Sequence, residues 1–247
     1  MLKKETISWD SKKLGRKMEL AVYGHYGISI LLFPATTDSC LENEENGMIQ
    51  AIQPLLESGR FKVFSLGAMN FESWLTKDKK TNEEKSEMHK KYNQYIIEEV
   101  LPFIFGECGC EVPIITAGAA IGAYHAANTF FRRPDIFLGT IAMSGTFDIT
   151  HYTNGFLDEK DNCYFNSPIH FLPKLKDNYW LSFLKSRKHI YLLSGKGENE
   201  YPENSEKLAS ILSDKQIKHV LDIWGEECGH NYSTWNLMLN KVLVNYL

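Results

Sequence analysis

Short apolar stretches alternate with longer stretches of helical spacing along the chain. Residues 28–33 form a nearly continuous apolar run, which is typical of a strand buried on both faces. Residues 47–58 place their apolar side chains on one side of a helix. This alternation predicts an α/β fold with a mostly parallel sheet and helices on both faces. Strands are expected at 18–23, 28–33, 61–66, 112–117, within 136–143, and at 189–194 and 219–224; helices are expected at 47–58, 92–105, 123–131, 206–215 and 232–246.

Two stretches interrupt this regular pattern. Residues 76–91 are highly charged, which indicates an exposed loop running into the next helix. Residues 150–178 are rich in Asn, Asp, His and Tyr, and we expect an irregular insertion over the edge of the sheet, a candidate lid. Because no repeat, low-complexity segment or linker divides the chain, a single α/β domain is expected over residues 1–247.

Composition narrows the class of protein. The chain is 43% hydrophobic and 23% charged, which is enough apolar material for a sizeable core and argues against disorder. The net charge of -4 is small and negative, whereas proteins that bind nucleic acids usually carry a basic stripe, so no nucleic-acid partner is expected. Residues 1–10 lack the apolar core of a signal peptide, and no run is long enough for a bilayer. We therefore expect a cytoplasmic protein with no membrane partner; a homo-oligomer stays open.

The cysteines indicate neither disulfides nor a metal. The five cysteines are odd in number and scattered, which is typical of reduced thiols in a cytoplasm. The Cys108-Gly-Cys110 segment is tighter than a zinc knuckle, and no second pair completes a tetrahedral site. We expect no metal and no cofactor.

Residues 114–125 run from a strand, through small residues, into a helix. Gly118 and Gly122 lie two positions on either side of Ala120, the spacing of the nucleophile elbow of hydrolases. The glycines are needed there because the central residue is strained and its neighbours come too close for larger side chains. The central residue here is alanine, whose methyl group cannot attack a carbonyl. Small residues at such a junction also serve close packing, so the pattern alone leaves both interpretations open.

The rest of a triad has candidates in the expected order. Elbow hydrolases place the acid after the nucleophile and the histidine last. The strand at 189–194 opens into a loop with Glu198 and Glu200, and the strand at 219–224 opens into a loop with His230. Both loops follow the carboxyl ends of strands, where open α/β sheets build their sites. Each of these residues alone could be a solvated surface residue, but the three placements coincide.

Motifs from about Leu14 to the end carry a family resemblance, and the segment from the elbow to Ser144 is the most specific. They are Tyr23-Gly24-His25-Tyr26-Gly27, Phe33-Pro34, Gly47-Met48, Glu72-Ser73-Trp74, residues 118–128, residues 133–137, Ser144-Gly145-Thr146-Phe147-Asp148, Asn166-Ser167-Pro168, Gly195-Lys196-Gly197, and Trp224-Gly225 with His230. With these motifs the chain resembles the esterase D-like branch of α/β-hydrolases, often called the putative esterase family.

The resemblance implies the α/β-hydrolase fold and a serine-type carboxylic ester hydrolase for small acyl or acylated-sugar esters. It places Ala120 at the nucleophile position and His230 as the general base. It puts the acid in the loop of residues 195–203, with Glu200 as the first choice and Glu198 as the second.

The resemblance also implies the remaining parts of a site. The oxyanion hole would use the backbone N–H of Ile121 and one from the loop after Phe33, either Ala35 or Thr36. Trp74 and Ser144 are candidate substrate-binding residues.

Two departures from the family pattern matter. The serine is absent, and Asn231 follows the histidine where relatives often have aspartate. Thr116 in the strand, Ser144 and Cys228 are poor substitutes, because a nucleophile must lie within hydrogen-bond reach of its base.

Two interpretations follow. The chain is an ester hydrolase in a disabled form, or a non-catalytic binding or scaffold protein on a hydrolase fold. Ala120 is natural or engineered; the retained histidine, loop glutamates and glycines favour a recent or engineered loss.

Overall fold

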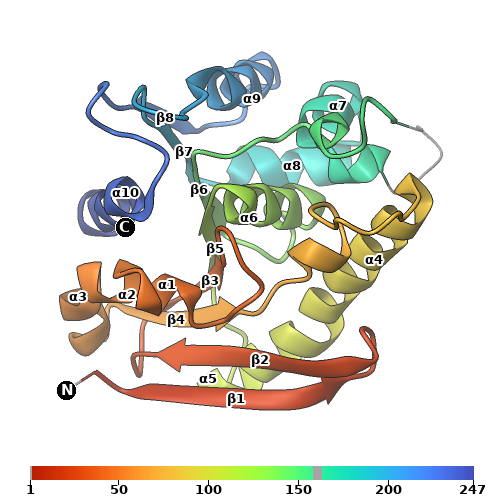
Figure 1. The fold of residues 1–247 in the computed structure, drawn as a ribbon. Helices are drawn as coiled ribbons and strands as arrows, with labels where there is room; N and C mark the ends of the chain where they lie inside the picture. Colours follow the sequence, from red (N-terminus) through yellow and green to blue (C-terminus); the bar gives the residue numbers. More distant parts are fainter. Residues whose placement is uncertain (1, 158–162) are drawn as a thin grey trace.

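The computed structural model describes residues 2–157 and 163–247, and it contains one mixed eight-stranded sheet (Figure 1). The strands lie in the order β1-β2-β4-β3-β5-β6-β7-β8, and all pairs from β4 to β8 are parallel. The predicted mostly parallel α/β fold is therefore confirmed. The strands are β1 (Lys4–Ser11), β2 (Arg16–Tyr23), β3 (Ile28–Phe33), β4 (Phe61–Leu66), β5 (Ile114–Ala119), β6 (Gly139–Met143), β7 (His189–Ser194) and β8 (Val220–Ile223).

Strand β1 was not expected from the sequence. It pairs antiparallel with β2 at the edge of the sheet, and most of its side chains are exposed or half-buried. An edge strand needs little apolar surface, and charged residues there discourage pairing with another chain. The hydrophobic pattern of residues 4–11 is correspondingly weak, so periodicity does not reveal the strand.

Helices cover both faces of the sheet (Figure 1). Alternate side chains of the central strands enter two separate apolar clusters: Leu31 and Phe33 pack on the α6 side, and Ile30 and Leu32 on the α10 side. One face carries α1 (Glu42–Glu45), α2 (Met48–Ala51), α3 (Gln53–Glu57) and α10 (Tyr232–Asn245); the other carries α4 (Asn82–Tyr95), the π-helical η2 (Ile96–Val100), α5 (Leu101–Cys108), α6 (Ile121–Arg132), α7 (Pro168–Lys174), α8 (Asn178–Ser186) and α9 (Pro202–Asp214).

The stretch at 150–178 is less irregular than its composition indicates. It includes the 3-10 turn η4 (Tyr164–Asn166) and helix α7, while residues 158–162 lie outside the described residues. Helix α7 escapes prediction because Pro168 opens it and Pro173 lies inside it, and a proline in a helix interior normally argues against one. The expected helix at 47–58 is likewise split into α2 and α3, with a proline at the start of α3.

No helix among residues 2–157 and 163–247 has the length and apolarity needed to cross a membrane.

Candidate active site

The turn between β5 and α6, at the position of the predicted elbow, has a strained backbone. Ala120 has φ 51° and ψ −120°, in the positive-φ region that L-residues rarely adopt. Its backbone N–H donates to the carbonyl oxygen of Met143 at 3.0 Å, so strand β6 holds the turn from the side. Such a conformation costs on the order of 1–3 kcal/mol and persists only where its surroundings fix it.

Two glycines allow this turn to pack. A Cβ on Gly118 would overlap the backbone of Gly122, and a Cβ on Gly122 would lie 2.6 Å from the carbonyl oxygen of Pro34. Helix α6 therefore approaches the loop after β3 at backbone distance. That close approach brings the start of α6 and residues 34–37 to the same point at the carboxyl end of the sheet.

Gly122→Ala is expected to destabilise the fold by about 1–3 kcal/mol, because the added methyl forces backbone atoms of residues 33–34 to move. Gly106→Ala is the matched control: Gly106 lies in α5, and a Cβ there would meet no described atom within 4 Å. Helix propensity then predicts an unchanged or slightly higher stability for the control. Urea denaturation of both variants measures the difference; equal stabilities would remove the packing argument.

The loop after β7 brings a buried carboxylate to the same edge of the sheet. The Glu200 side chain is fully buried, and its Oε1 lies 3.7 Å from Nδ1 of His230. Ser144 Oγ donates to Oε1 at 2.5 Å, and Ser194 Oγ donates to Oε2 at 2.8 Å. Burial raises the pKa of Glu200, but the neighbouring His230 and the hydrogen bonds from Ser144 and Ser194 outweigh it and leave the pKa lowered. The carboxylate is therefore held ionised beside the imidazole.

Backbone contacts join the acid loop to the histidine loop. The N–H of His230 donates to the carbonyl oxygen of Glu198 at 2.9 Å, and the N–H of Gly197 donates to that of Cys228 at 3.0 Å. The Glu198 side chain is exposed, so this residue contributes its backbone where Glu200 contributes its carboxylate. Asn231, which immediately follows His230, caps α10 by accepting from the N–H of Thr234.

The loop after β3 is organised by a buried glutamate. The Glu42 carboxylate accepts hydrogen bonds from the backbone N–H and the hydroxyl of both Thr36 and Thr37, and from the hydroxyl of Tyr232. Burial raises the pKa of Glu42, and these donors lower it further than burial raises it, so its pKa lies below the ordinary value.

These bonds correct one expectation for the oxyanion hole. The N–H of Thr36 is committed to Glu42 at 2.8 Å, so it does not face a ligand. Ala35 remains as the candidate from this loop; its backbone N–H faces the Tyr232 hydroxyl oxygen, which an oxyanion would have to displace. Ile121 is the first residue of α6, where a backbone N–H has no acceptor within the helix.

The two expected substrate-binding residues lie behind the site surface. Trp74 is 3% exposed and packs with Ile121 and Tyr124, so it supports the first turn of α6. Ser144 is 8% exposed, and its hydroxyl is engaged by Glu200 and by the indole N–H of Trp235. Neither side chain offers a substrate contact in this structure, because Trp74 is buried and the Ser144 hydroxyl is both buried and already hydrogen-bonded.

The other hydroxyl and thiol candidates are also accounted for. Thr116 is buried in β5, and its hydroxyl donates to the carbonyl oxygen of Ala126. Cys228 is buried and its thiol lies beside the carboxylate of Glu227. Four residues of the site have no motif that reveals them in the sequence. Glu42, Tyr232 and Trp235 reach it only through the packing of α1 and α10 against the sheet, and Ser194 is simply the last residue of β7.

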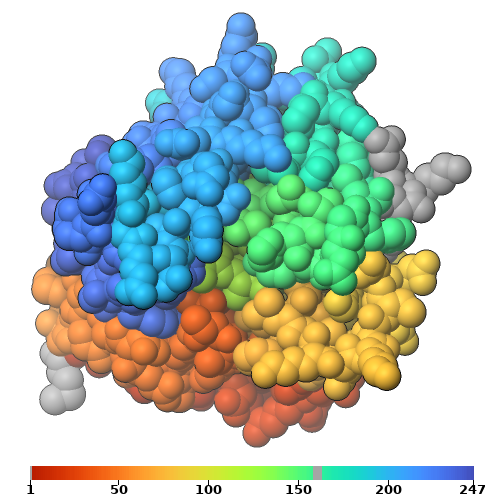
Figure 2. All heavy atoms as spheres, turned by 45° about the horizontal axis from the view of Figure 1, so that its top comes forward, coloured from red at the N-terminus to blue at the C-terminus, as the bar shows by residue number. Residues whose placement is uncertain are grey.

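The assembled residues converge at one edge of the sheet. Figure 2 looks toward this edge, and the yellow-green part of the chain that contains the elbow is visible between the orange, green and blue segments. Those segments supply the loop after β3, the loop after β6, and the acid and histidine loops. The site therefore combines the turn after β5 with four loops, each after the carboxyl end of a parallel strand.

Comparison with known proteins gives a family and a fold. The family model described as "Putative esterase" matches residues 42–246. No curated protein matches the chain. Among solved structures, the chain is similar to a ferulic acid esterase with 17% identity and a TM-score of 0.75, covering 98% of this chain and 96% of that one.

Two further structures have the same architecture. An S-formylglutathione hydrolase from Staphylococcus aureus has 13% identity and a TM-score of 0.68, with 98% of this chain and 95% of that chain covered. A ferulic acid esterase from Anaeromyces mucronatus has 13% identity and a TM-score of 0.70, with 98% and 90% covered. At these identities the likeness shows a common fold.

Proposed function

The chain belongs to the putative esterase family of α/β-hydrolase-fold proteins, and we propose from that premise that its site is built for hydrolysis of small carboxylic esters but lacks the nucleophile. One observation carries the proposal. Ala120 keeps the strained elbow backbone at the carboxyl end of β5, while a buried Glu200 lies 3.7 Å from His230 in the neighbouring loops. Packing alone gives no reason to hold both features at one edge of the sheet.

Each residue has a role in a serine-bearing version of this site. A hydroxyl at position 120 would lose its proton to His230 while attacking the ester carbonyl. Glu200 would orient the imidazole and stabilise its positive charge. The N–H groups of Ile121 and Ala35 would bind the developing oxyanion. The alcohol would leave with the proton from His230, and water would then release the acid by the same route.

With alanine at position 120, the covalent route is closed. The methyl group has no lone pair to attack with, so no acyl intermediate can form. Ester binding and oxyanion stabilisation would remain, and related sites without their triad keep only about 10³–10⁴-fold acceleration over water.

The experiment that tests the proposal restores the missing oxygen. Ala120→Ser would be assayed on p-nitrophenyl acetate and butyrate, an acetylated sugar, a feruloyl ester and S-formylglutathione, the last two chosen from the fold neighbours. The proposal is supported if any of these esters is hydrolysed by the Ala120→Ser protein and if that activity is lost when His230 is also replaced. A folded Ala120→Ser protein that is inactive on every ester would refute it.

A second function is binding without turnover, and Ala120 itself favours it. A site with an oxyanion hole and no nucleophile could hold an ester or its acid product. Titration of the unaltered chain with methyl ferulate or with acetate, followed by NMR, tests this. Saturable shifts near His230 without cleavage, in a chain whose Ala120→Ser variant stays inactive, would favour the binding protein.

A further inference from the structure

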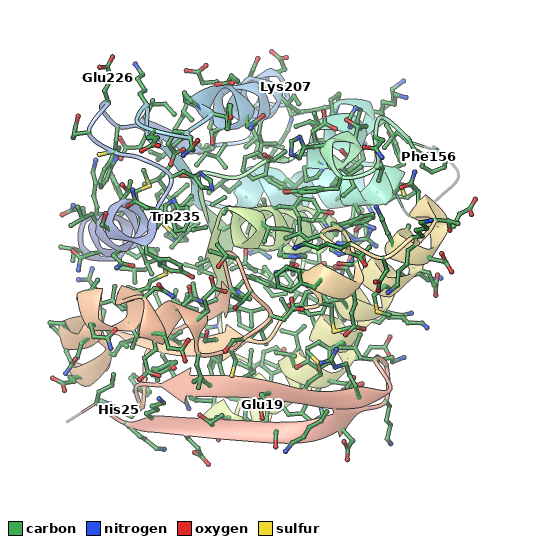
Figure 3. The ribbon with its side chains drawn as sticks, viewed as in Figure 1. Glu19, His25, Phe156, Lys207, Glu226 and Trp235 are labelled. Carbon is green, nitrogen blue, oxygen red and sulfur yellow. The ribbon has the colours of Figure 1, made fainter. Side chains whose placement is uncertain are left out.

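The buried surroundings of Glu200 contain a chain of hydrogen bonds that the triad roles do not use. It begins at Trp235 on α10, labelled in Figure 3, whose indole N–H donates to Ser144 Oγ at 3.1 Å. Ser144 Oγ in turn donates to Glu200 Oε1 at 2.5 Å. A serine hydroxyl has one proton to donate and lone pairs to accept with, so both bonds can form together.

Ser144 occupies a backbone position that aims this hydroxyl. It follows β6 directly and has φ 53°, one of the few positive values outside glycine. Its N–H donates to the carbonyl oxygen of Leu193 at 2.7 Å, which ties it to β7, the strand that leads into the acid loop. A strained residue at this point is maintained by its surroundings, as at functional sites.

Trp235 contacts the histidine as well as the serine. Its ring lies edge-on to the imidazole of His230, with centroids 4.9 Å apart and planes at 89°. Trp235 itself is almost completely buried. One side chain of α10 therefore acts on both partners of the acid–base pair: it contacts the imidazole directly and reaches the carboxylate through Ser144.

We propose that Ser144 and Trp235 are positioning residues that hold the Glu200 carboxylate and the His230 ring in the relative orientation that proton transfer needs. The proposal rests on the proposed function, because this orientation affects activity only if His230 acts as a base. Ser194 holds the second oxygen, Oε2, so the hydroxyls of Ser144 and Ser194 fix the carboxylate from both ends. Oε1 is the oxygen shared by Ser144 and His230 Nδ1, and loss of the Ser144 bond lets that oxygen turn away.

The first test reads the histidine directly in the unaltered chain. Nitrogen-15 NMR at pH 8, with His230→Gln for assignment, reports which ring nitrogen carries the proton. An Nδ1–H facing Glu200 is expected, because a carboxylate at that nitrogen selects this tautomer. Ser144→Ala and Ser144→Gly should both shift the population toward Nε2–H. Agreement of the two variants assigns the effect to the hydroxyl rather than to the positive φ, which glycine adopts without strain.

Two further variants complete this test. Trp235→Phe keeps an aromatic ring but removes the N–H, and it should move the tautomer in the same direction by less. Ser205→Ala is the matched control: Ser205 is buried in α9, and its hydroxyl has no hydrogen-bond partner among the described residues. An unchanged His230 spectrum in folded Ser144→Ala and Ser144→Gly proteins would overturn the proposal.

The second test separates positioning from substrate contact. In the Ala120→Ser background, Ser144→Ala should lower kcat by about 10- to 100-fold, the loss expected for a hydrogen bond to a charged group, with little change in KM. A raised KM with unchanged kcat would instead make Ser144 a substrate contact and overturn the positioning role. If Ala120→Ser shows no hydrolysis, the proposed function fails, and the NMR result still decides whether Ser144 orders His230.

Discussion

Ala120→Ser is expected to raise ester hydrolysis by at least about 10³-fold over the unaltered chain, because removal of a serine nucleophile alone costs up to about 10⁶ in comparable triads. The backbone at position 120 already has the strained positive φ that the proposed elbow needs, and Ser144, Ser194 and His230 already surround Glu200. Serine at this φ is no more strained than alanine, so the gain of activity should come with little loss of stability. Initial rates on the ester panel, compared between the two proteins, measure the gain.

Two histidine variants control this result. His230→Ala in the Ala120→Ser background should return the rate close to that of the unaltered chain, since no base remains beside the hydroxyl. His219→Ala should leave the rate unchanged, because His219 precedes β8 at the opposite end of the strand and its ring faces the carbonyl oxygen of Ile217. Loss of activity in both double variants, or in neither, would count against His230 as the base.

The second large effect is a loss of stability in mild acid, which originates in a buried histidine pair. His125 lies on α6, its Nε2 is 2.7 Å from Asn70 Oδ1, and burial lowers its pKa from 6.5 to about 3. His89 on α4 stacks against it with ring centroids 5.3 Å apart. Burial, followed by the nearby His125 and Arg132, lowers the pKa of His89 as well. Both rings are therefore neutral in the folded protein at pH values where the unfolded chain is protonated.

The direction of the pH effect follows from proton uptake. Below pH 6.5 each of these histidines is protonated in the unfolded state but not in the folded state. The free energy of unfolding therefore decreases as the pH falls from 6.5 toward about 3. Each such histidine lowers the free energy of unfolding by about 1.4 kcal/mol per pH unit. At pH 4.5 we expect a loss of about 3 kcal/mol from His125 alone, with His89 adding to it. The lowered pKa values of Glu42 and Glu200 add a further loss only below their unfolded value of 4.5.

Urea denaturation between pH 7.5 and 4.5 measures this dependence. His125→Gln can still donate a hydrogen bond to Asn70 but cannot take up a proton, so the slope of the unfolding free energy against pH should fall by about one proton. The slope is independent of any constant destabilisation that the substitution causes. His25→Gln, at an exposed position, controls for the chemistry of the change. An unaltered slope in His125→Gln would contradict the assignment.

The central strands and the tight turn around Ala120 are predictable because their signals are local. A strand buried on both faces must be apolar throughout, and residues 28–33 show this pattern. A tight strand-to-helix turn needs small residues at fixed spacing, and Gly118 and Gly122 show that pattern. Strand β1 and helix α7 escape because an exposed edge strand and a proline-containing helix lack such patterns. The family resemblance inferred from the motifs is confirmed by the match over residues 42–246.

The sequence by itself determined the fold class and the family, since both depend on residue type and spacing along the chain. Only the tertiary structure showed that the Glu200 side chain is buried beside His230 while Glu198 is exposed, because this depends on how two loops meet. It also committed the Thr36 amide to Glu42 and the Ser144 hydroxyl to Glu200. Those bonds join residues far apart in the chain, and a hydrogen bond between distant residues leaves no periodic trace in the sequence.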